Sequence, residues 1–251
     1  MKFLSSLLLS FCAVLVLVNQ VSAQKEITTG YDVVHSMYDK YEGDWYKNLT
    51  FTQKTSFYGQ DGNVERVQMW YEALMLPGKL AIRFDAIDSN NGILFRDGIQ
   101  YGYANGEKIQ EVERVHELLV LGFDIYHQHP DTSAKQLESR GFDLEKMYED
   151  EWQGRPVYVV GVDSADSTVA QFWIDKERLY FVRNITIGRA NTIQEVHFNK
   201  YERLGKGWIA PEVIFYANGF RGLLEEYSQI VIPVFMNEEI FDPEQFTTIE
   251  W

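Results

Sequence analysis

The sequence predicts a mainly β (α+β) fold, a curved antiparallel half-barrel of about eleven strands that is unclosed and covered by helices. Apolar and polar residues alternate with a period of two over most of residues 49–233, as expected for half-buried strands. Short polar links join neighbouring runs, which favours antiparallel pairing because parallel strands need long crossovers. Aromatic residues make up 15% of the chain against only 6 prolines, and this bias also favours strands.

The N-terminal segment, residues 1–23, is predicted to be a cleaved signal peptide. Lys2 precedes a twelve-residue apolar run that ends at Val18, and Val21-Ser22-Ala23 has the small residues of a signal-peptidase site. Twelve apolar residues are too few for a transmembrane helix, which needs about 20. We therefore expect export across the inner membrane and one mature domain over residues 24–251. The only cysteine, Cys12, would be removed, so we expect neither disulfides nor thiolate chemistry.

The charge of the chain restricts its partners. There are 37 acidic and 23 basic residues, a formal net charge of −14. Binding to a nucleic-acid backbone requires clustered cations, so we expect no nucleic-acid partner. An acidic protein is also repelled by anionic lipid headgroups.

The first half of the mature chain is predicted to be one helix followed by five strands. Between Thr29 and Tyr46 apolar residues recur every three or four positions, which indicates an amphipathic helix with Thr29 as its N-cap. A period of two then begins at Leu49. The predicted strands are 49–57, 64–76, 79–85, 92–96 and 99–103, and the first two form a hairpin.

The middle of the chain is predicted to be helical, with helices at Val112 to Ile125 and Ser133 to Tyr148 around a breaker at Gln128-His129-Pro130-Asp131. An open curved sheet must cover its concave face, so we expect this insert and the first helix to lie across it. The resulting groove would be lined by the sheet and roofed by a helix. Further strands are predicted at 157–162, 168–175, 179–187, 193–201, 208–216 and 224–233.

Several short motifs occur in an order that resembles a known family. They are Phe51-Thr52-Gln53-Lys54, the strand end Leu76-Pro77, the hairpin Arg96-Asp97-Gly98-Ile99-Gln100-Tyr101, Phe172-Trp173-Ile174-Asp175-Lys176 and Gly207-Trp208-Ile209-Ala210-Pro211. With the order of helices and strands, they resemble the LolA/LolB-like periplasmic lipoprotein carriers, over about residues 30 to 245. Two features depart from that family. Leu76 replaces an arginine thought to hold the helical lid, and the insert Glu111 to Glu151 is long and acidic.

The resemblance implies a periplasmic carrier that binds lipoprotein acyl chains for outer-membrane sorting and works with the inner- and outer-membrane sorting machinery. It would be a monomer without enzymatic activity, cofactor or metal. Each buried methylene contributes about 0.8 kcal/mol, so apolar contacts suffice for reversible binding. The expected lining residues are Leu74, Leu80, Ile82, Phe84, Tyr101, Tyr103, Phe172, Ile174, Phe181 and Ile185, with Leu118, Leu119 and Leu121 on the lid. The same alternation is typical of any sheet core, so ordinary packing is the alternative role.

The three lid leucines are too close in sequence to share one narrow helical stripe. At least one of them should therefore face the ligand space or the surface.

Two other functions remain open. One is a non-enzymatic lipid-binding or sensing module on the same fold. The other is a metal-dependent hydrolase, because His127, His129 and Asp131 offer ligand types that suit zinc. No third histidine lies near them, and a polar loop is the simpler interpretation. The carboxylates Asp143, Glu145, Glu149, Asp150 and Glu151 are expected to form a solvated helix face.

Overall fold

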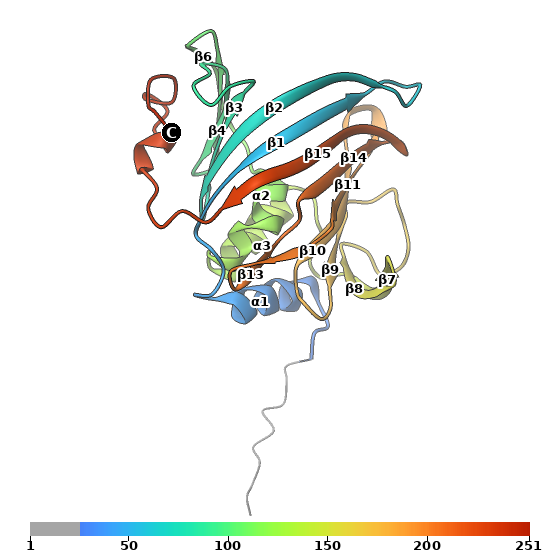
Figure 1. The fold of residues 1–251 in the computed structure, drawn as a ribbon. Coiled ribbons are helices and arrows are strands. Elements are labelled where there is room, and N and C mark those ends of the chain that lie inside the picture. Colours follow the sequence, from blue (N-terminus) through green and yellow to red (C-terminus); the bar gives the residue numbers. More distant parts are fainter. Residues whose placement is uncertain (1–25) are drawn as a thin grey trace, which may run out of the picture.

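The computed structural model describes residues 26–251, and the signal peptide predicted at 1–23 lies outside them. Within the described chain, thirteen strands form one open antiparallel sheet that curves over a layer of helices (Figure 1). The strand order is β6-β5-β4-β3-β2-β1-β15-β14-β11-β10-β9-β8-β7. The predicted α+β class and unclosed half-barrel are confirmed, with slightly more strands than the eleven expected.

The first five strands of the sheet agree closely with the prediction, whereas the sixth strand was not predicted. The first half of the sheet contains β1 (Asn48–Tyr58), β2 (Val64–Met75), β3 (Lys79–Phe84), β4 (Gly92–Arg96), β5 (Ile99–Ala104) and β6 (Glu107–Glu113). The second half contains β7 (Met147–Trp152), β8 (Arg155–Val160), β9 (Gln171–Asp175), β10 (Phe181–Ile187), β11 (Ile193–Asn199), β14 (Glu212–Ala217) and β15 (Phe220–Val231). The two halves meet where β1 pairs with β15, so the first and last strands of the domain lie side by side at the centre of the sheet.

The strand predicted over residues 208–216 is divided in two. β13 (Gly207–Ile209) pairs with β12 (Glu202–Leu204) in a separate two-stranded sheet, whereas β14 joins the main sheet. Ala210 and Pro211 lie between them. A proline has no N–H to donate to a ladder, which accounts for the interruption.

The first helix, α1 (Gly30–Tyr41), begins where the sequence predicted. The Thr29 side chain accepts a hydrogen bond from the Asp32 N–H, and the Asp32 carboxylate accepts one from the Thr29 N–H, which together form a capping box. The helix ends at Tyr41 rather than Tyr46. Its buried face, which includes Val33, Val34 and Met37, packs against the concave side of the molecule.

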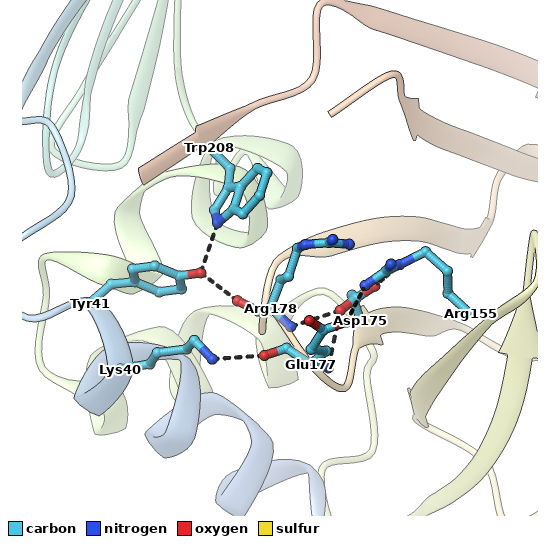
Figure 2. A network of polar contacts seen from close by, with 7 residues as sticks. All are labelled: Lys40, Tyr41, Arg155, Asp175, Glu177, Arg178 and Trp208. Atoms are coloured by element: carbon cyan, nitrogen blue, oxygen red, sulfur yellow. Dashed lines mark hydrogen bonds and ion pairs between the residues drawn. The ribbon is translucent and has the colours of Figure 1, made fainter. Parts of the chain in front are cut away.

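A polar network fixes the end of α1 to the turn between β9 and β10 (Figure 2). Lys40 Nζ donates to the carbonyl of Glu177 at 2.7 Å, and the Tyr41 hydroxyl donates to that of Arg178 at 2.5 Å. Trp208 Nε1 donates in turn to the Tyr41 hydroxyl at 3.0 Å. The buried Asp175 carboxylate in turn fixes the conformation of this turn, so α1 packs against a rigid part of the sheet.

The turn depends on Asp175, which ends β9 and belongs to the motif Phe172-Trp173-Ile174-Asp175-Lys176. Its Oδ1 accepts hydrogen bonds from the N–H groups of Glu177 and Arg178 at 3.0 and 2.7 Å. Its other oxygen accepts one from Arg155 of β8. This motif therefore has a structural role in positioning α1.

The mid-chain segment differs from the predicted pair of long helices. Val112 belongs to β6, and the helical part is divided into α2 (Glu117–Gly122), the short 3₁₀ turn η1 (Asp124–Tyr126) and α3 (Pro130–Ser139). The expected breaker instead starts α3. His129 is its N-cap and Pro130 occupies its first turn, where the missing N–H costs nothing. Residues expected at the end of the second helix form β7, with Glu149, Asp150 and Glu151 exposed.

The sheet has a hydrophobic core on each face. The larger core lies between the concave face and the helices and includes Leu74 and Ile82. Neighbouring positions on the same strands, Ala73 and Ala81, belong to the second core on the opposite face, since successive side chains alternate. Residues 236–251, with the 3₁₀ turn η3 (Glu238–Phe241), cover this second core on the side away from the helices (Figure 1).

Arg83 fastens this C-terminal segment to the sheet. Its buried guanidinium donates to the carbonyls of Phe246 and Ile249, each at 2.6 Å. Another short 3₁₀ turn, η2 (Arg189–Asn191), connects β10 and β11. No helix within residues 26–251 is long and apolar enough to cross a membrane.

Candidate functional site

A cavity of about 400 Å³ lies between the concave face of the sheet and the start of α2. Its size falls within the range of roughly 300–1,000 Å³ that is typical of small-molecule sites. Most of the wall is apolar, and it includes Phe51, Leu74, Leu80, Ile82, Phe198 and Val213. These side chains come from β1, β2, β3, β11 and β14, so the curvature of the sheet forms the cavity.

The lid of the cavity is α2. Leu118 and Leu119 line the cavity, whereas Leu121 is fully buried in the concave core. The helix is capped by His116, whose Nδ1 accepts a hydrogen bond from the Leu119 N–H at 3.2 Å. Burial lowers the pKa of His116 to about 4, so this histidine is neutral and available as an acceptor at neutral pH. Its ring packs edge-on against Phe95 of β4 at 4.7 Å between centroids.

Five of the thirteen residues predicted as lining do line the cavity: Leu74, Leu80, Ile82, Leu118 and Leu119. Phe84 is half-buried beside Trp70, a lining residue, with ring centroids 5.0 Å apart. Phe172, Ile174, Phe181, Ile185 and Leu121 lie in the concave core outside the cavity wall. Their strands alternate as predicted, but the segment that follows α3 packs directly against this half of the sheet, as the edge contact of Phe142 with Phe172 illustrates.

Tyr101 and Tyr103 are on the opposite face of the sheet from the cavity. Both belong to the second core, and Tyr103 donates a hydrogen bond to the Pro243 carbonyl at 2.7 Å and stacks on Phe246. No pattern in the sequence indicated that a C-terminal segment would cover this face. Their burial therefore comes from the convex side, not from the groove.

The sequence interpretation missed the polar part of the cavity. Glu72 on β2 and Glu225 on β15 line it although they are only 7% and 9% exposed. Burial raises the pKa of Glu225 to about 8. Burial, and then the charge of Glu225, raise the pKa of Glu72 well above its usual range. A signal was present, because each glutamate is two residues from a lining residue, Leu74 or Tyr227, and so shares its face.

A third acid, Glu195 on β11, also lines the cavity but is fully paired. Its Oε1 accepts hydrogen bonds from Arg183 and His197. Burial acts to raise the pKa of Glu195, but these two bonds outweigh it and lower the pKa. Glu195 is thus an ionised member of an ion-pair cluster, unlike Glu72 and Glu225.

The two histidines considered as metal ligands have separate contacts. His127 Nε2 lies 3.0 Å from the Tyr46 carbonyl oxygen, whereas His129 Nδ1 accepts a hydrogen bond from the Asp131 N–H at 3.3 Å as the cap of α3. Over residues 26–251, no group of three or more His, Cys, Asp or Glu side chains is placed to hold a metal ion.

Comparisons with known proteins were informative only at the level of structure. No protein-family model matches the sequence, and no curated protein matches it. A DUF1329 family protein from Desulfovibrio piger is similar, with a TM-score of 0.59, 14% identity and coverage of 84% of this chain and 95% of that chain. A protein from Vibrio parahaemolyticus assigned as an outer membrane lipoprotein-sorting protein domain has a TM-score of 0.59, 14% identity and coverage of 87% and 98%.

A LolA superfamily protein from Nitrosomonas europaea has a TM-score of 0.57 at 8% identity, with coverage of 86% of this chain and 98% of that chain. At such identities the likeness concerns the fold, and it extends over nearly the whole length of each of the three structures. The resemblance predicted from the sequence is therefore confirmed in three dimensions: the chain has the fold of the LolA superfamily and of outer-membrane lipoprotein-sorting domains.

Proposed function

We propose that the protein is a periplasmic carrier that binds the acyl chains of a lipoprotein or lipid in the cavity beneath α2, without catalysing a reaction. The observation that carries this proposal is the cavity itself, about 400 Å³ with a mainly apolar wall and a helical lid. The likeness to an outer-membrane lipoprotein-sorting domain supports it. The mature chain, residues 24–251, would act as one unit, exchanging its ligand with sorting machinery at the inner and outer membranes.

The energetics suit a carrier that must release what it binds. Burial of apolar chain contributes about 0.8 kcal/mol per methylene, so a partly buried chain is held reversibly. Leu118 and Leu119 stand on a helix of six residues that takes no part in the hydrogen bonding of the sheet. The lid can therefore open without loss of the sheet.

The test is displacement of a fluorescent fatty-acyl probe from the mature protein. Leu118→Asp places a charge in the cavity wall, and we expect the affinity for the probe to fall at least about tenfold. Ile109→Asp is the matched control, because Ile109 lies exposed on β6 away from the cavity. Circular dichroism should be unchanged for both variants. Unchanged probe binding by a folded Leu118→Asp protein would contradict the proposal.

A second measurement separates a carrier from a sensing module. The protein is purified from its own periplasm and examined by native mass spectrometry for a bound acyl species. A carrier then transfers that species to acceptor vesicles, whereas a sensing module retains it.

A further inference from the structure

The polar part of the cavity is centred on β1. Glu72 of β2 faces Phe51 across the strand pair, and Glu225 of β15 faces Thr55. Gln53 lies between these two positions, opposite Trp70 on one side and Tyr227 on the other. Both carboxyls and the Gln53 amide line the same cavity. The register of three adjacent strands thus places two acids on either side of Gln53 in an apolar cavity.

The two acids differ in their hydrogen bonds. Glu225 accepts from the Tyr227 hydroxyl at 3.2 Å and from the Gln53 side chain, whose Nε2 also donates to Thr55 Oγ1 at 2.8 Å. Glu72 is more than nine-tenths buried, and within the described chain no hydrogen bond or ion pair reaches its carboxyl group. The Oδ1 atom of Asn184, a residue only 1% exposed that also lines the cavity, has no hydrogen-bond partner among the described residues either.

Within the described chain, no ion pair joins another charged group of the wall to these acids. Arg114 donates to Gln100 at 2.8 Å, Glu117 pairs with Arg140 at 3.2 Å, Glu195 pairs with Arg183, and His116 caps α2. Buried acceptors without donors are unfavourable and are rarely left in this condition in native structures. Two separate positions on the cavity wall, the Glu72 carboxyl group and the Asn184 oxygen, therefore favour a ligand that carries N–H donors.

We propose that the cavity binds an amphiphile with a primary ammonium group, whose nitrogen is held by Glu72 and Glu225 while its apolar chain lies against the wall formed by Leu74, Leu80 and Phe198. This inference rests on the proposed carrier function and specifies the chemistry of its ligand. An ammonium group supplies three donors and a positive charge, and its hydrogen bonds to carboxylates are of the strong, charge-assisted kind. It matches the acceptor-rich region as a carboxylate or phosphate head group does not.

Binding would also move a proton. Burial raises the pKa of Glu225 to about 8 and also raises that of Glu72, so Glu225 is mainly protonated at pH 7. When the ammonium group pairs with them, a carboxyl group ionises and its proton passes to the solvent. The proton balance is one neutral carboxyl group and one ammonium giving an ion pair and one released proton.

The experiment compares three probes with the same twelve-carbon chain, dodecylammonium, dodecanol and dodecanoate, by isothermal titration of the mature protein. We expect dodecylammonium to bind at least about tenfold more tightly than dodecanol, and dodecanoate to bind most weakly. Titration in two buffers with different ionisation enthalpies should show proton release for the amine alone. Equal affinities for the amine and the alcohol, or preference for dodecanoate, would overturn the inference while leaving the carrier function intact.

The variants test the assigned residues. In Glu72→Gln/Glu225→Gln the preference for the amine should disappear while dodecanol binding remains. The control is Glu226→Gln, since Glu226 is adjacent on β15 and pairs with Lys54 at 3.0 Å at the surface, and it should behave as the wild type. If the double variant does not fold, Glu72→Gln alone is used, because no partner is lost there. Undiminished amine preference in either variant would refute the role of the glutamates.

Two ligand sources share this chemistry, and two further arms distinguish them. One offers vesicles of phosphatidylethanolamine, and the other a lipidated peptide with a free or an acetylated N-terminus. Extraction of the vesicle lipid assigns a headgroup amine. Preference for the free over the acetylated peptide assigns a terminal amine. If none of the probes, vesicles or peptides binds, the proposed carrier function itself is wrong.

Discussion

The Asp124 carboxylate accepts a hydrogen bond from the backbone N–H of Gly78 at 2.8 Å. This contact joins η1, which directly follows the lid helix, to the turn between β2 and β3. Gly78 has a φ of +83°, a conformation that favours glycine. The resemblance seen in the sequence implied a lid held by an arginine before the proline of this turn, and here that position is Leu76. The connection between lid and turn is therefore made from the lid side, by an acid.

We predict that Asp124→Ala lowers the free energy of unfolding by about 1–3 kcal/mol, because the Gly78 N–H loses its acceptor. Asp124→Asn retains an acceptor and should cost less. Burial raises the pKa of Asp124 to about 7, against the opposing hydrogen bond from Gly78. Its proton is then lost from the unfolded chain first, so stability falls as pH rises from about 4 to 7. Denaturant titrations at pH 5 and 8 should show a smaller difference for Asp124→Asn than for the wild type.

Glu225 should give a similar pH dependence in a higher range. Its pKa is raised from 4.5 to about 8, so the folded state retains a proton that the unfolded chain releases above pH 4.5. Stability contributed by the protonated group is full below pH 4.5 and is lost as pH rises through 8. Glu225→Gln should therefore be more stable than the wild type at pH 9, by a few kcal/mol in order of magnitude, and similar at pH 4. Equal thermal stabilities at pH 9 would show that Glu225 is not buried as described.

Substitutions of Leu118 and Leu121 should affect different properties, ligand binding for Leu118 and stability for Leu121. Leu121 is fully buried in the core, and Leu121→Ala should cost about 2–5 kcal/mol in unfolding free energy. Leu118 is half-buried in the cavity wall, so Leu118→Ala should change stability less and weaken acyl binding more. Chemical denaturation and probe titration of both variants provide the check. If Leu121→Ala weakened binding more and Leu118→Ala lowered stability more, then Leu121 and not Leu118 would line the cavity.

Asp175 should stabilise the packing of α1 against the turn between β9 and β10. Asp175→Ala removes the acceptor of two backbone N–H groups and of Arg155, and we expect a loss of about 1–3 kcal/mol. Glu177→Ala is the control, because its exposed side chain can be removed while its carbonyl still accepts from Lys40, and it should change stability by less than about 0.5 kcal/mol. Amide hydrogen exchange should quicken in α1 for Asp175→Ala alone.

The strands that could be predicted from the sequence are those with one face in the apolar concave core and the other face in a different environment. In β3, Leu80 and Ile82 face the concave core, and this contrast with their neighbours produces the period of two. In β6 every residue is exposed, so the strand has no buried face and its sequence shows no apolar alternation. Val112 was therefore assigned to a helix. In β7 the half-buried residues Met147, Tyr148 and Trp152 are separated by three exposed acidic residues, so no period of two is visible there either.

The site was predicted only in part because periodicity identifies faces and not what covers them. Leu74 and Tyr101 both lie on correctly predicted strands, but one faces the cavity and the other a C-terminal segment. Glu72 and Glu225 were missed because a glutamate in an alternating strand is usually on the solvent side. Only the phase shared with Leu74 and Tyr227 would have revealed them.

An open half-barrel ends in two edge strands, here β6 and β7, each of which pairs with another strand on one side only. Such free edges can recruit strands from other molecules and so lead to aggregation. Here each edge strand carries three acidic residues, Glu107, Glu111 and Glu113 on β6 and Glu149, Asp150 and Glu151 on β7. Five of the acidic residues of the mid-chain insert thus lie on the two edge strands. Edge-to-edge association of two copies would bring like charges together, so the open architecture is protected by electrostatic repulsion at both of its margins.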